Sequence, residues 1–381
     1  MLKLIRSGAA VTRAQIVQQT GLARSTVAQR VDALVAAGLI YEAGDSLSTG
    51  GRRPTRLAFR HDSGVVLSAD LGATPSRGAV HDLPAGPEAE TAYDAEIADG
   101  PERTLALVHE RFLALLAEAG RDRAHVRGIG VGVPGPVAFG TGRAVNPPIM
   151  PGWDRFSIPD WFADRFPDAP VLVDNDVNIM ALGEHSAHWR ESDHLLYVKV
   201  GTGIGCGIVA SGHIHRGEVG AAGDIGHIVV TDHEDVVCRC GNIGCLEAVA
   251  GGHALARRLS AAGHPAQRSR DVVRLVREGN SDAVQMVREA GRTLGEVLAS
   301  CVNFFNPRVI VIGGDLGDVH EHLLAGVREI VFQRSLPLAT RDLRIVPSQL
   351  GDRAGVTGAA NMVIEHILSP AAVDRALREA A

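Results

Sequence analysis

Apolar residues in the central and C-terminal parts of the chain form short runs that end at glycine or at acidic residues. Short apolar runs bounded by turn residues predict buried strands. The strands predicted in this way lie at 65–71, 126–133, 171–173, 195–200 and 309–312. Apolar residues at helical spacing predict helices between several of them, at 105–119 and 284–303. This alternation predicts an α/β protein, in which ligands gather at the carboxyl ends of strands.

The first part of the chain predicts two short helices joined by a glycine turn. Residues 12–20 read as one helix with Thr12 as its N-cap, and Gly21 follows as the turn. Ser25 is expected to cap a second helix, whose valines and leucines recur at helical spacing, and Gly38 is expected to end it. Helix, glycine turn and helix form the helix-turn-helix pattern.

Two short strands are predicted after these helices, at 39–41 and 56–59, with a polar loop at 45–54 between them. Such a loop resembles the wing of a winged helix, and its arginines can reach phosphates or a narrow minor groove. The alternative is a helical interaction domain without DNA. The side chains expected to contact DNA are Arg24, Ser25, Thr26, Gln29, Arg30, Arg52 and Arg53.

Charge separates this segment from the rest. Residues 1–60 hold nine Lys/Arg and three Asp/Glu, a net charge of +6, whereas the whole chain carries −6, which leaves −12 for the remainder. A basic segment on an acidic body indicates contact with a polyanion. The length of 381 residues exceeds what one core usually supports, so more than one domain is expected. No apolar run or leader indicates a membrane span, and we expect a cytoplasmic protein.

Three of the five cysteines lie close together, with a histidine shortly before them. His227, Cys238, Cys240 and Cys245 supply the thiolate and imidazole ligands that tetrahedral Zn²⁺ prefers. Four protein ligands leave no open position, so the zinc is expected to be structural. The alternatives are buried free cysteines or a disulfide.

The same segment resembles a known family. His227 and the run Cys238-Cys240-Gly241-Gly244-Cys245-Glu247 are similar to the signature of the ROK family (repressors, open reading frames, kinases). Residues 1–60 resemble the winged helix of ROK repressors. The resemblance implies a winged helix-turn-helix at 1–60, followed by the two-lobed α/β actin/hexokinase-like (ribonuclease H-like) ATPase fold. The first lobe is expected at 61–175, joined by a C-terminal helix at 355–381, and the second lobe, with the zinc-bound sugar loop, at 176–354.

The resemblance assigns several strand ends to nucleotide binding. The expected phosphate and ATP loops contain Asp70, Gly72, Thr74, Gly201, Thr202, Gly203, Gly205, Gly313 and Gly314. In the first loop, Ala73 stands where family kinases carry glycine, and Pro75 stands where they carry a basic residue. Pro75 removes a donor and a charge near the phosphates. ATP use is therefore open, while the second loop is intact.

The resemblance also implies a sugar site. The expected sugar-binding residues are Asn175, Asp176, Asp224, His227 and Glu247. Asp176 is the general base if the protein is a kinase. The alternatives are a helix N-cap role for Asp176 and solvated surface charges for Asp224 and Glu247. Asp224 stands where the family usually has glutamate.

Two functions follow as hypotheses. The first is a sugar-responsive transcription regulator, most simply a repressor, whose partners are operator DNA and a monosaccharide or sugar phosphate. The second is an ATP-dependent sugar kinase with an added DNA-binding head. Paired DNA half-sites favour a homodimer or a dimer of dimers.

Overall fold

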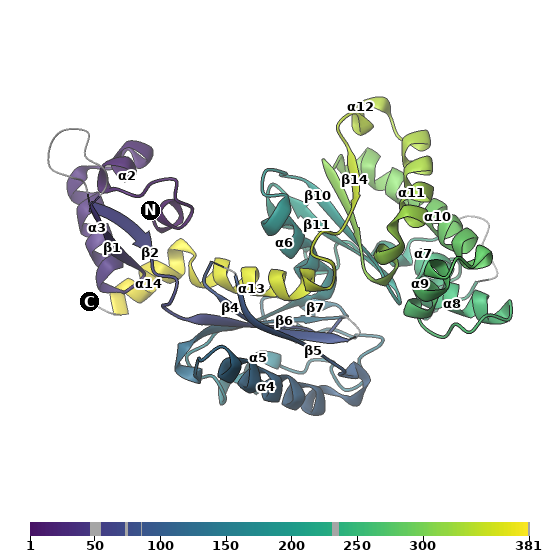
Figure 1. The fold of residues 1–381 in the computed structure, drawn as a ribbon, viewed down its shortest axis with the longest axis horizontal. Helices are drawn as coiled ribbons and strands as arrows, with labels where there is room; N and C mark the ends of the chain where they lie inside the picture. Colours follow the sequence, from purple (N-terminus) through teal and green to yellow (C-terminus); the bar gives the residue numbers. More distant parts are fainter. Residues whose placement is uncertain (46–54, 73–74, 85, 231–235, 380–381) are drawn as a thin grey trace.

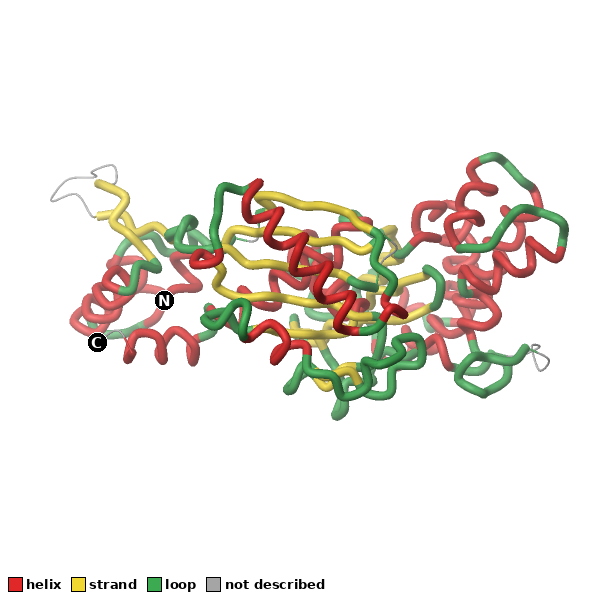
Figure 2. The backbone as a smooth tube through the Cα atoms, turned by 90° about the horizontal axis from the view of Figure 1, so that it is seen from below, coloured by secondary structure: helices red, strands yellow, loops and turns green. Residues whose placement is uncertain are grey.

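The computed structural model of the chain describes residues 1–45, 55–72, 75–84, 86–230 and 236–379. These residues form a small N-terminal head and two five-stranded sheets. Figure 1 shows the head at one end of an elongated molecule and helices α8 to α11 at the other, and Figure 2 shows the same arrangement from below.

The head consists of α1 (Leu2–Arg6), α2 (Arg13–Thr20), α3 (Arg24–Ala36), β1 (Ile40–Asp45) and β2 (Thr55–Phe59). The predicted cap of α2 is confirmed, because the Thr12 side chain accepts a hydrogen bond from the Gln15 N–H at 3.2 Å. Gly21 follows this helix in the left-handed conformation, with φ 68°. The turn is therefore of the kind that glycine supplies without strain.

The predicted cap of the second helix is wrong. Helix α3 begins at Arg24, and its N-cap is Ala23, which provides no side-chain hydrogen bond. The turn is tighter than the sequence suggested, so Ser25 lies inside the first helical turn. Strands β1 and β2 pair antiparallel up to Asp45 and Thr55. The loop that carries Arg52 and Arg53 lies outside the described residues.

The first sheet has the order β5-β4-β3-β6-β9. Its strands are β3 (Val65–Asp70), β4 (Ser76–Asp82), β5 (Pro87–Tyr93), β6 (Val126–Val133) and β9 (Val171–Asn175). Helices α4 (Pro101–Glu118) and α5 (Ile158–Ala163) cover one face, and α13 (Ala354–Ile367) covers the other (Figure 1). A Cβ on Gly130 of β6 would lie 2.4 Å from the Ala359 carbonyl, so α13 packs directly on the sheet.

The second sheet has the order β12-β11-β10-β13-β14. Its strands are β10 (Leu195–Val200), β11 (Ile204–Ala210), β12 (His213–Ile214), β13 (Val309–Gly313) and β14 (Arg344–Pro347). The associated helices are α6 (Asp176–His188), α7 (Leu246–Ala250), α8 (Gly252–Ala261), α9 (Ser269–Arg277), α10 (Ser281–Phe305), α11 (His320–Arg334) and α12 (Pro337–Thr340). Strands β10 and β13 are parallel, so the loops after them lie at one edge of the sheet.

Helices α6 and α13 lie between the two sheets. Helix α13 packs on β3 and β6, and α6 packs on β10 and β11. A Cβ on Gly358 of α13 would lie 1.6 Å from the Ile179 carbonyl of α6. The two helices therefore meet through their backbones, with no side chain between them.

The head shares one apolar core with the C-terminal helices. Ile16 and Val27 of the head belong to the same buried cluster as Val363, Ile364 and Val373. The last two helices are α13 and α14 (Pro370–Glu379), and Figure 1 shows α14 beside the head. The head is thus packed against the body through α13 and α14.

The segment expected as a single C-terminal helix forms these two helices instead. The domain boundaries at residues 60, 175 and 354 stay predictions. Within the part of the chain that the structure describes, no helix is both long enough and apolar enough to cross a membrane.

Candidate sugar cleft, metal cluster and DNA-binding surface

A cleft of about 620 Å³ lies where the carboxyl ends of strands from both sheets meet. It brings together most of the residues expected to bind sugar or nucleotide. Those that line it are Gly72, Asn175, Asp176, Gly201, Thr202, Gly203, Gly205, Asp224, His227, Glu247, Gly313 and Gly314. Asp70 is fully buried and does not line the cleft. Thr74 lies outside the described residues.

Asp176 begins α6, but it is not the N-cap of that helix. Asn175 is the N-cap, and its side-chain oxygen accepts from the Val177 N–H at 2.9 Å. The same amide donates to the Gly135 carbonyl at 3.2 Å. Asn175 is therefore held by the protein on both sides, and Asp176 Oδ1 likewise accepts from the Val177 N–H at 2.9 Å.

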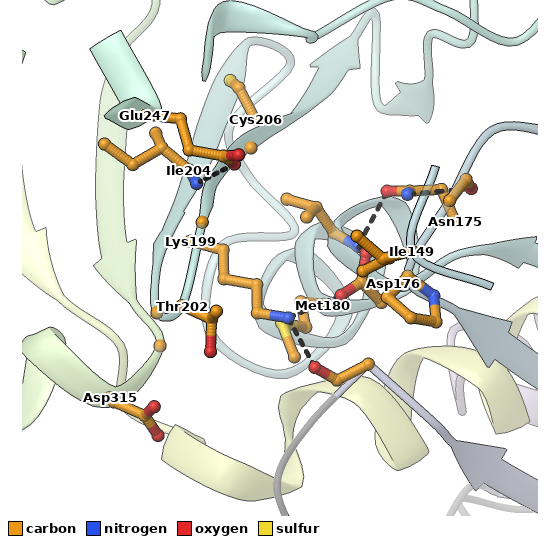
Figure 3. Close-up of a pocket in the computed structure, with 18 of the residues that line it drawn as sticks. Ile149, Asn175, Asp176, Met180, Lys199, Thr202, Ile204, Cys206, Glu247 and Asp315 are labelled. Carbon is orange, nitrogen blue, oxygen red and sulfur yellow. Dashed lines mark hydrogen bonds and ion pairs between the residues drawn. The ribbon is translucent and has the colours of Figure 1, made fainter. Parts of the chain in front are cut away.

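Lys199 lines the cleft, and the sequence interpretation missed it. It lies on β10, and its Nζ donates to Asp176 Oδ2 at 2.5 Å and to the Gly72 carbonyl at 2.8 Å (Figure 3). Burial of Lys199 lowers the pKa of its ammonium group. The negative charges of Asp176 and Asp70 together have a larger effect in the other direction, so the pKa is raised. A lone lysine in an apolar strand, one residue before a glycine loop, was the available signal.

Asp70 lies beneath this ion pair. Its Oδ1 accepts from the Gly72 N–H at 2.9 Å. Desolvation raises the pKa of Asp70 to about 7, against the opposing effect of Lys199. A Cβ on Gly355 would lie 1.9 Å from Asp70 Oδ2, so the start of α13 rests on this carboxyl group.

Glu247 projects into the other side of the cleft from α7. Its Oε2 accepts from the Ile204 N–H at 3.0 Å (Figure 3). Gly203 permits this position, because a Cβ there would lie 2.0 Å from the same oxygen. The hydrogen bond fixes one carboxylate oxygen of Glu247, so this residue is not a freely solvated surface charge.

Asp224 directly precedes a short 3₁₀ turn at Ile225–His227, and His227 is the last residue of that turn. The Asp224 side chain is 62% exposed, and its Oδ1 lies 4.0 Å from His227 Nε2. The other ring nitrogen of His227, Nδ1, lies 3.6 Å from Cys238 Sγ. One side of the imidazole thus faces the cysteines, and the other side faces Asp224.

The four expected metal ligands lie together. One ligand atom from each of His227, Cys238, Cys240 and Cys245 lies within 4.8 Å of all the others. The Sγ atoms of Cys240 and Cys245 are 3.7 Å apart, which excludes a disulfide between them. Tetrahedral bonds of about 2.3 Å place two zinc-bound sulfurs about 3.8 Å apart. The donor set and its spacing therefore fit a tetrahedral metal ion.

In the loops that are expected to bind nucleotide, several backbone and side-chain groups already have partners within the protein. The Gly201 N–H donates to the Gly203 carbonyl at 3.0 Å, and the Gly72 N–H is taken by Asp70. Asp315, after β13, places a carboxylate here that accepts from Ser269 and Arg270. Two backbone donors of the loops expected to bind phosphate therefore have partners within the protein, and the Asp315 carboxylate is paired with Arg270.

The predicted DNA-contacting face lies at the start of α3. Arg24, Ser25, Gln29 and Arg30 are exposed there, and Thr26 is half-buried. Apolar side chains on the opposite face of the helix are buried in the head. The helix therefore presents its polar residues outward, as a recognition helix does.

Head and cleft together define a class of protein, a two-lobed actin/hexokinase-like body that carries a winged helix-turn-helix. The chain belongs to the ROK family, whose model matches residues 66–366. A model described as winged helix-turn-helix DNA-binding matches residues 1–41.

Similar proteins carry both parts. The xylose repressor of Caldicellulosiruptor bescii is 30% identical over 97% of this chain and 95% of its own length. The crystal structure of a ROK family transcriptional regulator, a homologue of the E. coli Mlc protein, is similar with a TM-score of 0.84 and 27% identity. That similarity covers 99% of this chain and 97% of the other.

Kinases share the body alone. A ROK family glucokinase from Streptomyces griseus, solved with glucose and AMPPNP, is similar with a TM-score of 0.65 and 27% identity. The similarity covers 78% of this chain and 99% of the glucokinase.

Proposed function

We propose that this chain is a sugar-responsive transcriptional repressor of carbohydrate-metabolism genes. The observation that carries the proposal is the path from cleft to head: α13 starts against Asp70 beneath the cleft and ends in the core of the winged helix. A change in the cleft that moves α13 must also move the head. Sugar binding and DNA binding are then coupled if the sugar binds one arrangement of α13 and the head more tightly than another.

The DNA partner is an operator duplex that the exposed face of α3 reads. The basic charge of residues 1–60 supplies the electrostatic part of the affinity. Two half-sites on the duplex suit two copies of the chain, so we propose a homodimer in the cytoplasm. A dimer of dimers serves two operators in the same way.

The proposed effector is a neutral monosaccharide. Asp176, Asp224 and Glu247 offer acceptors to hydroxyl groups, and Asp176 is already neutralised by Lys199. Asp224 and Glu247 supply two further carboxylates, and Arg239 and Arg257 line the cleft as well.

We propose that the metal is Zn²⁺ bound by His227 and the three clustered cysteines. When bound, zinc supplies structural cross-linking of the sugar loop and no reaction chemistry. His227 would then hold the ion through Nδ1 and leave Nε2 toward Asp224 and the sugar. This arrangement links the order of the loop to the position of two sugar-binding residues.

Sugar phosphorylation is the second candidate function, since Asp176 holds the place of a general base. Its ammonium partner and the occupied loop donors oppose that role. A panel of monosaccharides, their phosphates and ATP, screened by thermal shift, separates the two. A neutral sugar should raise the melting temperature and ATP should not. If the melting temperature rises only when ATP and sugar are both present, and a coupled assay shows turnover, the kinase function is favoured.

A further inference from the structure

Lys199 joins three parts of the molecule through its hydrogen bonds. It stands on β10 of the second sheet, reaches the Gly72 carbonyl at the end of the first sheet, and pairs with Asp176 at the start of α6. The two hydrogen bonds use two of the three donors of the ammonium. In Figure 3 its side chain crosses the cleft toward Asp176.

The ion pair is largely withdrawn from water. The side chains of Lys199 and Asp176 are 16% and 5% exposed. Charge-assisted hydrogen bonds at such sites are short and strong, and loss of one partner leaves an uncompensated charge. The pair therefore holds one defined arrangement of the two sheets as long as both partners remain.

The cleft places this pair in competition with the effector. Asp176 lines the cleft, and both of its carboxylate oxygens already accept hydrogen bonds, Oδ1 from the Val177 N–H and Oδ2 from Lys199. A sugar hydroxyl that donates to Asp176 Oδ2 must share or displace the ammonium. If the ammonium moves, its bond to the Gly72 carbonyl is strained or lost as well.

We propose that Lys199 is an interlobe latch that the sugar opens, and that its opening is the first step of the response. This inference rests on the proposed function. Closed, the latch fixes the first sheet against β10 and α6. Open, it lets α6 shift, and α6 carries α13 with it because the two helices contact through Gly358 and the Ile179 carbonyl. Helix α13 then displaces the core that it shares with the head.

The experiment compares K199M, K199R and the double variant K199M/D176N with the wild-type chain. K199M removes the ammonium but keeps an unbranched side chain only one atom shorter, whereas K199R keeps the charge. The double variant removes both charges, so it leaves no unpaired buried charge if K199M folds poorly. The probe is a fluorescent duplex that the wild-type chain selects from a random-sequence library, and anisotropy reports its affinity with and without each monosaccharide of the panel.

Without sugar, K199M and the double variant should bind the duplex about 5- to 150-fold more weakly than wild type, the range of ordinary allosteric coupling. Added sugar should weaken the binding of K199M little further, and K199R should behave more like wild type. The double variant is compared only without sugar, because it also lacks the Asp176 carboxylate proposed to bind sugar. If both methionine variants bind like sugar-free wild type while sugar still releases the wild-type chain, the latch is wrong and the proposed function stands. A wild-type chain that no sugar releases would overturn the proposed function and the latch together.

Discussion

Gly203→Ala is the most specific test of the proposed sugar site. A Cβ at this position would lie 2.0 Å from Glu247 Oε2 and 2.8 Å from its carboxyl carbon. Real contacts of this kind stay above 3.0 Å, so the carboxylate must retreat by about 1 Å. The retreat breaks its 3.0 Å hydrogen bond from the Ile204 N–H and takes it away from the sugar.

The expected loss follows from that geometry. A hydrogen bond to a charged group contributes about 1.5–3 kcal/mol, so a misplaced Glu247 should raise the Kd for the sugar about 10- to 150-fold. Isothermal titration with the monosaccharide that gives the largest thermal shift measures the change. Gly140→Ala is the matched control, because a Cβ there meets nothing within 4 Å and its backbone is not left-handed.

A double variant shows whether the effect passes through Glu247. If it does, Gly203→Ala should add little to the loss already caused by Glu247→Ala, because both remove the same contact. Sugar affinity within twofold of wild type in Gly203→Ala, with an unchanged melting temperature, would refute the reasoning. Equal losses in Gly203→Ala and Gly140→Ala would do the same.

Three further predictions concern the metal, a buried carboxyl group and the DNA. Cys240→Ser should lose about one equivalent of zinc per chain and bind sugar more weakly, because a tetrahedral site loses one of four ligands; elemental analysis showing a stable, sugar-binding, metal-free wild type would contradict this. The raised pKa of Asp70, about 7, means that its contribution to stability is present below about pH 4 and is lost as pH rises to 7. As pH rises across that window, the free energy of unfolding of Asp70→Asn should therefore increase relative to wild type by up to about 1.4 kcal/mol per pH unit. If the difference in free energy of unfolding between the two proteins stays the same at every pH, the effect is excluded. Gln29→Ala and Arg30→Ala should change sequence preference, whereas Arg52→Ala and Arg53→Ala should weaken binding to every duplex, as selection and salt titration would measure.

Strands with clean apolar runs were predictable from the sequence. Strands β6 and β10 have the predicted bounds, because a histidine precedes each strand and Pro134 or Gly201 follows it. Strands β4 and β5 were not predicted, since residues such as Ser76 and Glu90 interrupt any apolar run. The long helix α10 begins three residues before the predicted start, at a polar turn whose Asn280 cap was the missed signal.

The residues of the candidate site also divide into those that the sequence predicted and those that it did not. The cysteine cluster was visible because its ligands lie close together in the sequence. Lys199 was not, because its two partners lie 23 and 127 residues away. The shared core of head and α13 was equally hidden, since it joins the two ends of the chain. Contacts between residues so far apart in the sequence are set by the packing of the sheets and leave no local sequence pattern.

The most direct test of the central claim is the affinity of the intact chain for its selected duplex during a titration with the stabilising monosaccharide. The account predicts sequence-specific, salt-sensitive binding that the sugar weakens by at least about fivefold, without ATP. A duplex affinity that stays constant throughout the titration would contradict it.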